Sequence, residues 1–531
     1  MARGFGLATL FLWWVGLIRL APAAAMLGTA PGLQEPIAVE GGQLTGTPTV
    51  QWTPGVRLFR GIPYAAPPVG TQRWRAPQPV VPWQGVKRAA DFSPACMQMP
   101  TNTDGNAWRE GHVPVSEDCL GLNIWTPARS AADRLPVMVW IHGGGNSRGA
   151  ASENQYDGAY LAKKGVVFVS FNYRMNVFGF MAHPELTRES EHHSSGNYAL
   201  LDQIAALQWV QRNIARFGGD PASVMIFGHS AGAANVVSLL ASPLAKGLFH
   251  RALALSGTSL AVRTTLAEAE KAGVTFAQTL GAPSLAALRQ KPAEEVLRAK
   301  QPRMGPVVDG WVLPQDVYSI FAAGRQSRVP LVVGTVADDA PGAGTAPTAA
   351  AAHTDARSTY GERADRYLKL YPATTDAEAA KSAHAFRTNS ALANARLLAR
   401  LHSKTAQSPV YWYFFTHTSP MPEGVVWDGR PAPSWGAYHG SELVYVFNAF
   451  PFQDWAWRPV DRKLGETISS MWVTFARTGS PNGSGLPEWP VFDPKLEVLM
   501  NFGDTPKAQP APHKAQIDFI DEWNAVQRIR R

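Results

Sequence analysis

The sequence predicts an α/β fold in which a mostly parallel central sheet is flanked by helices. Short runs of β-branched and aromatic residues alternate with helical stretches along the chain, the order that parallel strands and their crossover helices produce. The 531 residues, 45% hydrophobic and 17% charged, suffice to bury a large core. A disordered chain and a small disulfide scaffold are therefore excluded.

The predicted elements are bounded by glycine, proline or polar residues. A long amphipathic helix is predicted over Asn197–Phe217, where apolar residues recur at spacings of three and four. The sequence Phe217-Gly-Gly-Asp-Pro221 ends it, and a second helix is predicted over Ala231–Ala241. The predicted strands are Val137–Ile141, Val166–Phe171, Val224–Gly228, Ala252–Ser256, Leu331–Gly334 and Val410–Phe415.

One segment, Ala340–Ala352, is rich in Ala, Gly, Pro and Thr, which predicts a mobile loop. It directly follows a pair of aspartates considered below. Two interpretations stay open: a loop that borders a functional site, or a solvated insertion.

The first 25 residues have the pattern of a secretory signal peptide. Arg3 gives a positive start, Phe5–Ile18 is apolar, and Ala23–Ala25 offers a small-residue cleavage site. The apolar stretch is too short for a comfortable membrane span. We therefore expect export to the periplasm or the medium, no stable membrane insertion after cleavage, and a single domain over residues 26–531.

The two cysteines, Cys96 and Cys119, are expected to form a disulfide in an oxidising compartment. The alternative is a pair of free buried thiols. The net charge of +8 is spread along the chain without a run of five Lys or Arg, so no nucleic-acid partner is expected.

The strongest chemical signal is Gly228-His229-Ser230-Ala231-Gly232, between a predicted strand and a predicted helix. A serine on such a tight turn needs small neighbours, and the turn lifts its hydroxyl above the sheet edge. The helix that follows favours developing negative charge at its N-terminus. This context predicts that Ser230 is a nucleophile.

A second glycine-rich turn, His142-Gly143-Gly144-Gly145, follows the strand Val137–Ile141. Its backbone N–H groups, together with that of Ala231, predict an oxyanion hole. Each donor of this kind contributes about 3 kcal/mol to the transition state.

A nucleophilic serine needs a base, and the base needs an acid that orients it. His439 lies downstream in Gly436-Ala437-Tyr438-His439-Gly440, as the chain order serine, acid, histidine requires. His417, which closes a strand, is the competitor and is expected to be structural. The acid is expected after the strand that starts at Leu331, where Asp338 and Asp339 stay open as alternatives.

Other candidate sites are weaker. Glu191-His192-His193 lies in a polar Ser-rich stretch that indicates an exposed loop rather than a metal site. No sequence pattern calls for a metal or cofactor. Among the tryptophans, Trp435 and Trp108 are the expected neighbours of the site.

Several motifs together resemble the type B carboxylesterases, the family that includes the cholinesterases. The similarity covers nearly all of the chain after the signal peptide. The motifs that carry it are Phe59–Ala65, Glu117–Asn123, Asn213–Pro221, Gly228–Gly232, Pro306–Gly310, Phe475–Gly479 and Trp489-Pro490. The resemblance implies an α/β-hydrolase fold with a deep active-site gorge and a small-molecule ester substrate.

The same resemblance assigns roles to individual residues. It implies Ser230 as nucleophile, His439 as base, and Gly144, Gly145 and Ala231 as oxyanion donors. The acid falls on Asp339, where most relatives have Glu, with Asp338 as the alternative. Ser256 and Glu442 align with groups that support the histidine in relatives.

Two departures from the family pattern concern the substrate. His229 stands where relatives usually have Glu, which counts against a cationic ester. A gapless count from Ser256 places Arg263 at the acyl-pocket wall, where a cation would favour an anionic acyl group. This predicts esters of polycarboxylates such as tricarballylate, as cleaved by the fumonisin esterases of the family. The alternatives are a generalist short-acyl esterase, an amidase, or a non-catalytic cholinesterase-like binding protein. The sequence does not predict the oligomeric state.

Overall fold

The computed structural model describes Met1 and residues 33–48, 53–99, 114–258, 260–261, 264–302, 305–339, 347–424, 426–427, 430–431 and 435–529. Residues 2–25 of the predicted signal peptide therefore lie outside the described residues. At the centre is an 11-stranded sheet in the order β18-β17-β14-β13-β12-β11-β9-β10-β8-β4-β3. Neighbouring strands from β10 to β17 are parallel, and those at both edges are antiparallel. This confirms the predicted fold class.

The strands of the sheet are β3 (Thr47–Pro48), β4 (Arg57–Pro63), β8 (Gly121–Thr126), β9 (Leu135–Ile141), β10 (Val167–Phe171), β11 (Gly219–His229), β12 (Arg251–Leu255), β13 (Leu331–Val336), β14 (Val410–Phe415), β17 (Val498–Phe502) and β18 (Lys507–Pro510). Smaller sheets contain β1 (Ile37–Val39), β2 (Gly42–Thr45) and β5 (Val86–Arg88), β6 (Ala95–Cys96) and β7 (Val115–Ser116), and β15 (Val426–Trp427) and β16 (Arg430–Pro431).

The α-helices are α1 (Ala159–Lys163), α2 (Asn176–Phe180), α3 (Pro184–Glu189), α4 (Tyr198–Asn213), α5 (Ala231–Ala241), α6 (Leu266–Thr279), α7 (Leu285–Gln290), α8 (Ala293–Arg298), α9 (Val317–Ala322), α10 (Ala349–Tyr360), α11 (Ala364–Leu370), α12 (Asp376–Ala406), α13 (Leu443–Phe447), α14 (Pro459–Thr478) and α15 (Lys514–Ile529). Within the described ranges, none of these helices combines the length and apolar character needed to cross a membrane.

All six predicted strands lie in the sheet, and two boundaries differ from prediction in an instructive way. β11 starts at Gly219 rather than Val224, because Gly219 already pairs with Leu135 before a register shift. The prediction of a loop over Ala340–Ala352 is wrong at the C-terminal end of this segment. Residues 349–352 form the first turn of α10, whose Ala351 N–H donates to Thr348 Oγ1 at 3.2 Å. Residues 340–346 lie outside the described ranges.

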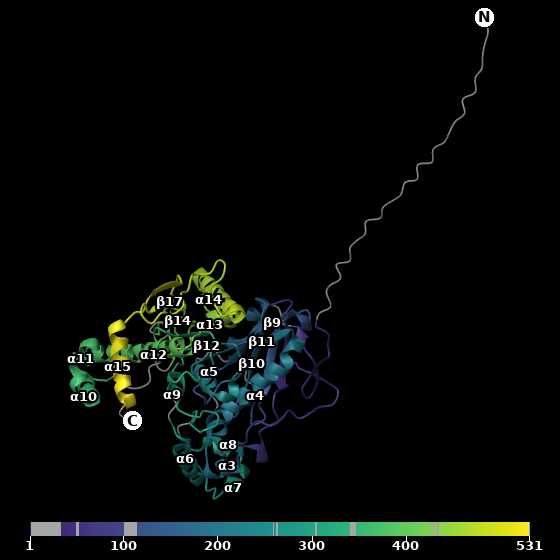
Figure 1. Ribbon diagram of the computed structural model, residues 1–531, viewed down its shortest axis with the longest axis horizontal. Coiled ribbons are helices and arrows are strands. Elements are labelled where there is room, and N and C mark those ends of the chain that lie inside the picture. Colours follow the sequence, from purple (N-terminus) through teal and green to yellow (C-terminus); the bar gives the residue numbers. More distant parts are fainter. Residues whose placement is uncertain are drawn as a thin grey trace.

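Alternation along the strands divides the interior into two cores, because successive side chains point to opposite faces. On β9, Val137, Val139 and Ile141 belong to the core that also contains side chains of α4, α5 and α12. Met138 and Trp140 belong to the other core, with side chains of α1, α13 and α14. Figure 1 shows α13 and α14 on one side of the strands and α4 on the other. The central strands are thus buried on both faces, which explains their continuous apolar runs.

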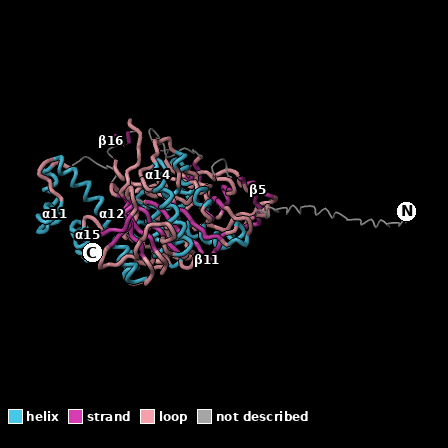
Figure 2. The backbone as a smooth tube through the Cα atoms, turned by 90° about the horizontal axis from the view of Figure 1, so that it is seen from above, coloured by secondary structure: helices cyan, strands magenta, loops and turns pink. Residues whose placement is uncertain are grey.

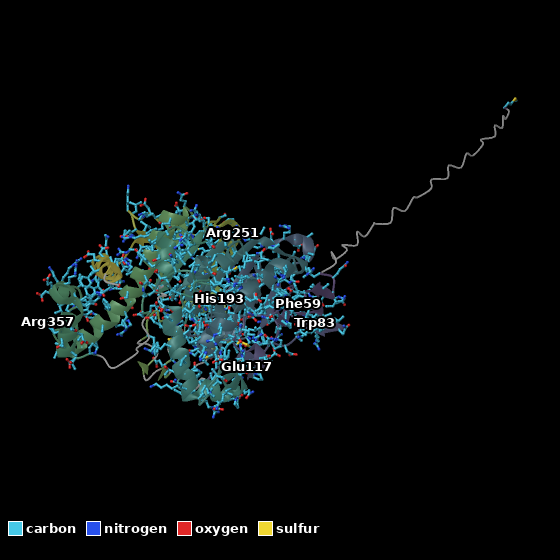
Figure 3. All side chains as sticks on the ribbon, turned by 60° about the horizontal axis from the view of Figure 1, so that its bottom comes forward. Phe59, Trp83, Glu117, His193, Arg251 and Arg357 are labelled. Atoms are coloured by element: carbon cyan, nitrogen blue, oxygen red, sulfur yellow. A yellow bond between two sulfur atoms is a disulfide. The ribbon has the colours of Figure 1, made fainter. Side chains whose placement is uncertain are left out.

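A smaller aromatic cluster forms one end of the molecule. It joins α10, α11, α12 and α15 through side chains that include Tyr360, Tyr367, Phe386, Phe519 and Trp523. Figure 2 shows α11, α12 and α15 together at this end, with β5 at the other end. Figure 3 likewise places Arg357 of α10 far from Phe59 and Trp83. The central strands, where the predicted site lies, are between these ends.

Candidate active site

Ser230 occupies a strained turn between β11 and α5. Its φ of 57° and ψ of −123° lie in a region that non-glycine residues rarely adopt. The Ser230 N–H donates to the Leu255 carbonyl at 2.9 Å, and the Ser230 carbonyl accepts from Ala234 N at 3.0 Å. These bonds tie the turn to β12 and to the first turn of α5, so the surrounding structure maintains the strain.

Two glycines allow this turn to pack against the end of β9. A Cβ on Gly232 would lie 2.1 Å from the Ile141 carbonyl oxygen, and one on Gly228 would lie 2.7 Å from the same oxygen. Because the obstructing atom is backbone, it cannot rotate away. Glycine is therefore required on both sides of Ser230, as the small-residue pattern predicts.

The glycine-rich loop after β9 packs closely against this turn. Gly144 and Gly145 have φ of 106° and 65°, and a Cβ on Gly143 would lie 2.7 Å from the His229 carbonyl oxygen. The Asn235 side chain of α5 donates to Asn146 Oδ1 at 3.0 Å, which fixes the loop to the helix behind Ser230. Ala231 begins α5 directly after the serine.

The adjacent aspartates after β13 have different partners. Asp339 Oδ1 lies 2.5 Å from His439 Nδ1, and Asp339 Oδ2 accepts from Thr335 Oγ1 at 2.6 Å. Asp338 instead accepts from the Ala437 N–H at 2.9 Å and lies 3.0 Å from His384 Nε2. Asp338 thus connects the two loops, and Asp339 contacts the histidine. The structure brings together the pair that the resemblance implies.

The charge on His439 is controlled by its surroundings. Burial lowers the pKa of His439, but the hydrogen bond and charge of Asp339 and the charge of Glu442 outweigh it and raise the pKa above the ordinary value. Glu442 is 2% exposed, and burial raises its pKa to about 7. Ser256 Oγ donates to Glu442 Oε1 at 3.1 Å. Both carboxyl groups therefore favour the protonated form of the imidazole.

Ser230 and His439 line the same cavity, of about 400 Å³. The His439 side chain is 26% exposed, so a ligand can reach it. Among the described residues that line this cavity, Arg148 is the single Arg or Lys and none is Asp or Glu. The lining consists of Gly143, Gly144, Gly145, Ser147, Arg148, Gln155, Tyr156, His229, Ser230, Tyr438, His439, Gly440 and Leu443.

The remaining predicted neighbours lie differently. Trp435 is buried and packs edge-to-face on Tyr438, with ring centroids 6.1 Å apart, behind the cavity rather than in its lining. Arg263 and Trp108 lie outside the described residues. Cys96 and Cys119 form the expected disulfide.

The competing histidine, His417, belongs to a buried polar network. Its Nδ1 lies 2.6 Å from Asp504 Oδ1, and its Nε2 lies 2.6 Å from Asp461 Oδ1. Tyr445 and Arg458 also donate to Asp461. Both ring nitrogens of His417 are thus engaged, and the residue does not line the cavity.

Sequence reasoning did not identify the lining residues Arg148, Gln155, Tyr156 and Leu443. One signal was available for Arg148, because it is a cation in the loop that follows the glycine triplet. The Ser147–Arg148 turn folds back on the glycines, with both backbone N–H groups donating to the Gly144 carbonyl at 3.1 Å. Tyr156 and Leu443 carry no chemical pattern, so only the fold places them here.

A strained serine, a glycine-rich loop and a His–Asp pair at the carboxyl edge of a mostly parallel sheet define a hydrolase of the α/β-hydrolase class. Comparison with known proteins specifies the class further. The family model described as "Carboxylesterase family" matches residues 34–520. The chain belongs to this family and is a carboxylic-ester hydrolase.

Curated relatives are similar over most of their length. The chain is 38% identical to fumonisin B1 esterase of Sphingopyxis macrogoltabida, over 84% of this chain and 83% of the relative. It is 35% identical to carboxylesterase 1E of Mus musculus, over 90% and 91% of the two chains. It is also 35% identical to liver carboxylesterase of Sus scrofa, over 88% of each.

Proposed function

We propose that this ester hydrolase works through an acyl-enzyme on Ser230. The Ser230 hydroxyl attacks the ester carbonyl carbon while His439 takes its proton, and Asp339 holds the imidazole and stabilises its charged form. Backbone N–H groups of Gly144, Gly145 and Ala231 bind the oxyanion. His439 then protonates the leaving alcohol. Water, deprotonated by His439, attacks the acyl-enzyme and releases the carboxylic acid and free Ser230.

The observation that carries this proposal is the convergence of the three side chains from separate elements. Ser230 on its strained turn and His439 line one cavity, and Asp339 contacts the far nitrogen of the imidazole at 2.5 Å. With Nδ1 engaged, Nε2 is the nitrogen left for the serine proton.

For the substrate, we propose an ester whose acyl group carries a carboxylate, such as a tricarballylate ester. The described cavity lining contains one guanidinium, that of Arg148, and no carboxylate. Such a lining favours an anionic ligand because a guanidinium forms strong bidentate hydrogen bonds with carboxylates. The similarity to a relative named fumonisin B1 esterase supports the same class. Arg263 is the second candidate cation.

The first experiment is hydrolysis of p-nitrophenyl esters whose acyl groups are neutral, cationic or anionic, with Ser230→Ala as control. We expect turnover that depends on Ser230, and the highest kcat/KM for the anionic acyl group. A fluorophosphonate probe should label the wild type and not Ser230→Ala. Labelling of the variant, or no Ser230-dependent turnover of any ester, would contradict the proposed mechanism. Preference for short neutral acyl groups would identify a generalist esterase. Cleavage of the matching p-nitroanilides would identify an amidase.

We also propose that the chain is exported with cleavage after Ala25. The support is the residue pattern of the first 25 positions alone. Expression of the full chain in a Gram-negative host should give a periplasmic or extracellular product whose N-terminal residue is Met26. A cytoplasmic product that retains Arg3 would refute export.

A further inference from the structure

His229 stands out in the cavity lining because its buried Nε2 lacks a hydrogen-bond partner among the described residues. The residue is 6% exposed and lines the cavity beside Ser230. A buried polar atom without a partner costs about 1–3 kcal/mol, and a ligand or water that bonds to the atom removes this cost.

The imidazole of His229 lies directly against that of His439. The two ring centroids are 4.5 Å apart and the ring planes are inclined by 42°. Gly440 permits this approach, because a Cβ there would lie 3.3 Å from His229 Cε1. His229 therefore lines the cavity between Ser230 and His439.

This environment keeps His229 uncharged. Burial, and then the charge of His439, hold the pKa of His229 well below its ordinary value. A neutral imidazole has one N–H donor and one acceptor. It can donate to a substrate oxygen, including a carboxylate, without adding a second positive charge beside the base.

We propose that His229 is a specificity-determining residue, whose imidazole donates a hydrogen bond to a substrate oxygen and favours acyl groups that carry a carboxylate. The inference rests on the proposed esterase function and specifies which residue of the cavity recognises the acyl group of the substrate. Arg148 supplies charge to the same cavity, whereas His229 supplies a buried donor next to the reacting bond.

The test compares wild type with His229→Gln, His229→Leu and His229→Glu on a p-nitrophenyl hemisuccinate and a p-nitrophenyl butyrate. The readout is the ratio of the two kcat/KM values, anionic over neutral. We expect His229→Gln, which keeps an N–H donor, to stay within about threefold of the wild-type ratio. His229→Leu should lower the ratio by roughly tenfold or more, and His229→Glu by roughly a hundredfold, because a charged hydrogen bond is lost or replaced by repulsion.

His402→Gln is the matched control, since His402 is also a buried histidine but its Nε2–H donates to the Val329 carbonyl at 2.8 Å, outside the cavity. Its ratio should equal that of the wild type. Unchanged ratios in both His229→Leu and His229→Glu would overturn the inference. The fluorophosphonate probe distinguishes failure of the proposed esterase mechanism from failure of the role proposed for His229. Absence of Ser230 labelling in the wild type would refute the esterase mechanism. Labelling together with an unchanged ratio would refute only the role of His229.

A measurement on the wild type covers the case in which those variants do not fold. Histidine side chains labelled with ¹⁵N give an Nε2 resonance for His229, assigned by its loss in His229→Gln, or in His229→Asn if the Gln variant does not fold. Succinate, the acid product, should shift this resonance, and butyrate should shift it less. Equal shifts, or no shift at saturating succinate, would contradict the inference.

Discussion

At the scale of single residues, the neighbouring aspartates Asp338 and Asp339 have different roles because their side chains contact different partners. Asp338 pairs with the loop before His439 through both its own N–H and its carboxylate. This pairing fixes the distance between the loops after β13 and before α13. Asp339 then reaches the imidazole, with Oδ1 2.5 Å from His439 Nδ1. The contacts of Asp338 thus support the position of the neighbouring acid.

This division predicts unequal effects of the two isosteric substitutions. Asp339→Asn removes the negative charge that stabilises the protonated imidazole and can place an NH2 donor against Nδ1, which favours the wrong tautomer of His439, so kcat should fall by roughly 10³–10⁴-fold. Asp338→Asn keeps an oxygen that can accept from the Ala437 N–H, so kcat should fall less than about tenfold. Steady-state hydrolysis of one ester by both variants is the measurement. A larger loss in Asp338→Asn would reverse the assignment.

Glu442 makes the activity depend on pH in a predictable direction. His439 must be neutral to act as base, so activity falls as pH decreases through its pKa. The charge of Glu442 raises that pKa, and therefore Glu442→Gln should move the acid limb of kcat/KM to lower pH. Since burial places the pKa of Glu442 itself at about 7, the wild-type limb reflects both groups together.

The profile of kcat/KM against pH, measured for wild type and Glu442→Gln, tests this. Glu466→Gln serves as control, because Glu466 is exposed and pairs with Lys164 outside the cavity. An acid limb that stays in place, or moves to higher pH, in Glu442→Gln would contradict the electrostatic account.

The sequence predicts the reacting residues better than the cavity around them. Ser230, His439 and the glycines carry recognisable spacing, since strained turns and backbone donors admit few residue types. The choice between Asp338 and Asp339 depends on a loop contact that spans about a hundred positions of sequence, and residue spacing alone does not encode it. Tyr156 and Leu443 are ordinary apolar residues that the fold alone brings to the cavity.

At the scale of elements, the close contact of the Ser230 turn with the end of β9 determines how precisely the nucleophile is placed. Gly232→Ala would force a Cβ to within 2.1 Å of the Ile141 carbonyl oxygen, so α5 must shift. We expect a loss of stability of about 1–3 kcal/mol and a fall in kcat of roughly a hundredfold. Thermal melting and the fluorophosphonate labelling rate measure the two effects.

Gly305→Ala is the matched control, because no atom lies within 4 Å of a Cβ built there. It should leave both measurements close to wild type. A Gly232→Ala variant with wild-type labelling would show that the turn tolerates displacement, contrary to its packing.

The strands were predictable because burial on both faces makes them continuous apolar runs, and helix α4 because one face repeats at helical spacing. Boundaries were less predictable. β11 extends back to Gly219 through Asp220 and Pro221, polar and proline residues that no local pattern would place in a strand. Residues 349–352 are four alanines, which favour a helix, and Thr348 caps them into α10; the Gly and Pro residues before them dominated the loop prediction.

At the scale of the whole molecule, the C-terminal helix α15 is held to α12 by buried charge as well as by the aromatic cluster. The Arg396 side chain is fully buried, with Nη1 2.7 Å from Asp518 and Nη2 2.9 Å from Asp521. Glu497, just before β17, lies 3.4 Å from Nη1. One guanidinium thus connects α12, α15 and the approach to the sheet edge.

Arg396→Met should therefore destabilise the protein by about 3–5 kcal/mol, because it leaves carboxylates without their buried partner. Arg366→Met removes a pair to the same helix, but Arg366 and Glu522 are each about half exposed. It should cost less than about 1 kcal/mol, since solvent screens exposed pairs. Denaturant unfolding gives both free energies, and limited proteolysis should release the segment after residue 513 in Arg396→Met alone. Because α15 lies at the end of the molecule away from β11 (Figures 1 and 2), Ser230 labelling of the folded fraction should persist. Equal costs for the two variants would show that the aromatic contacts, rather than the buried guanidinium, hold the C-terminal helix.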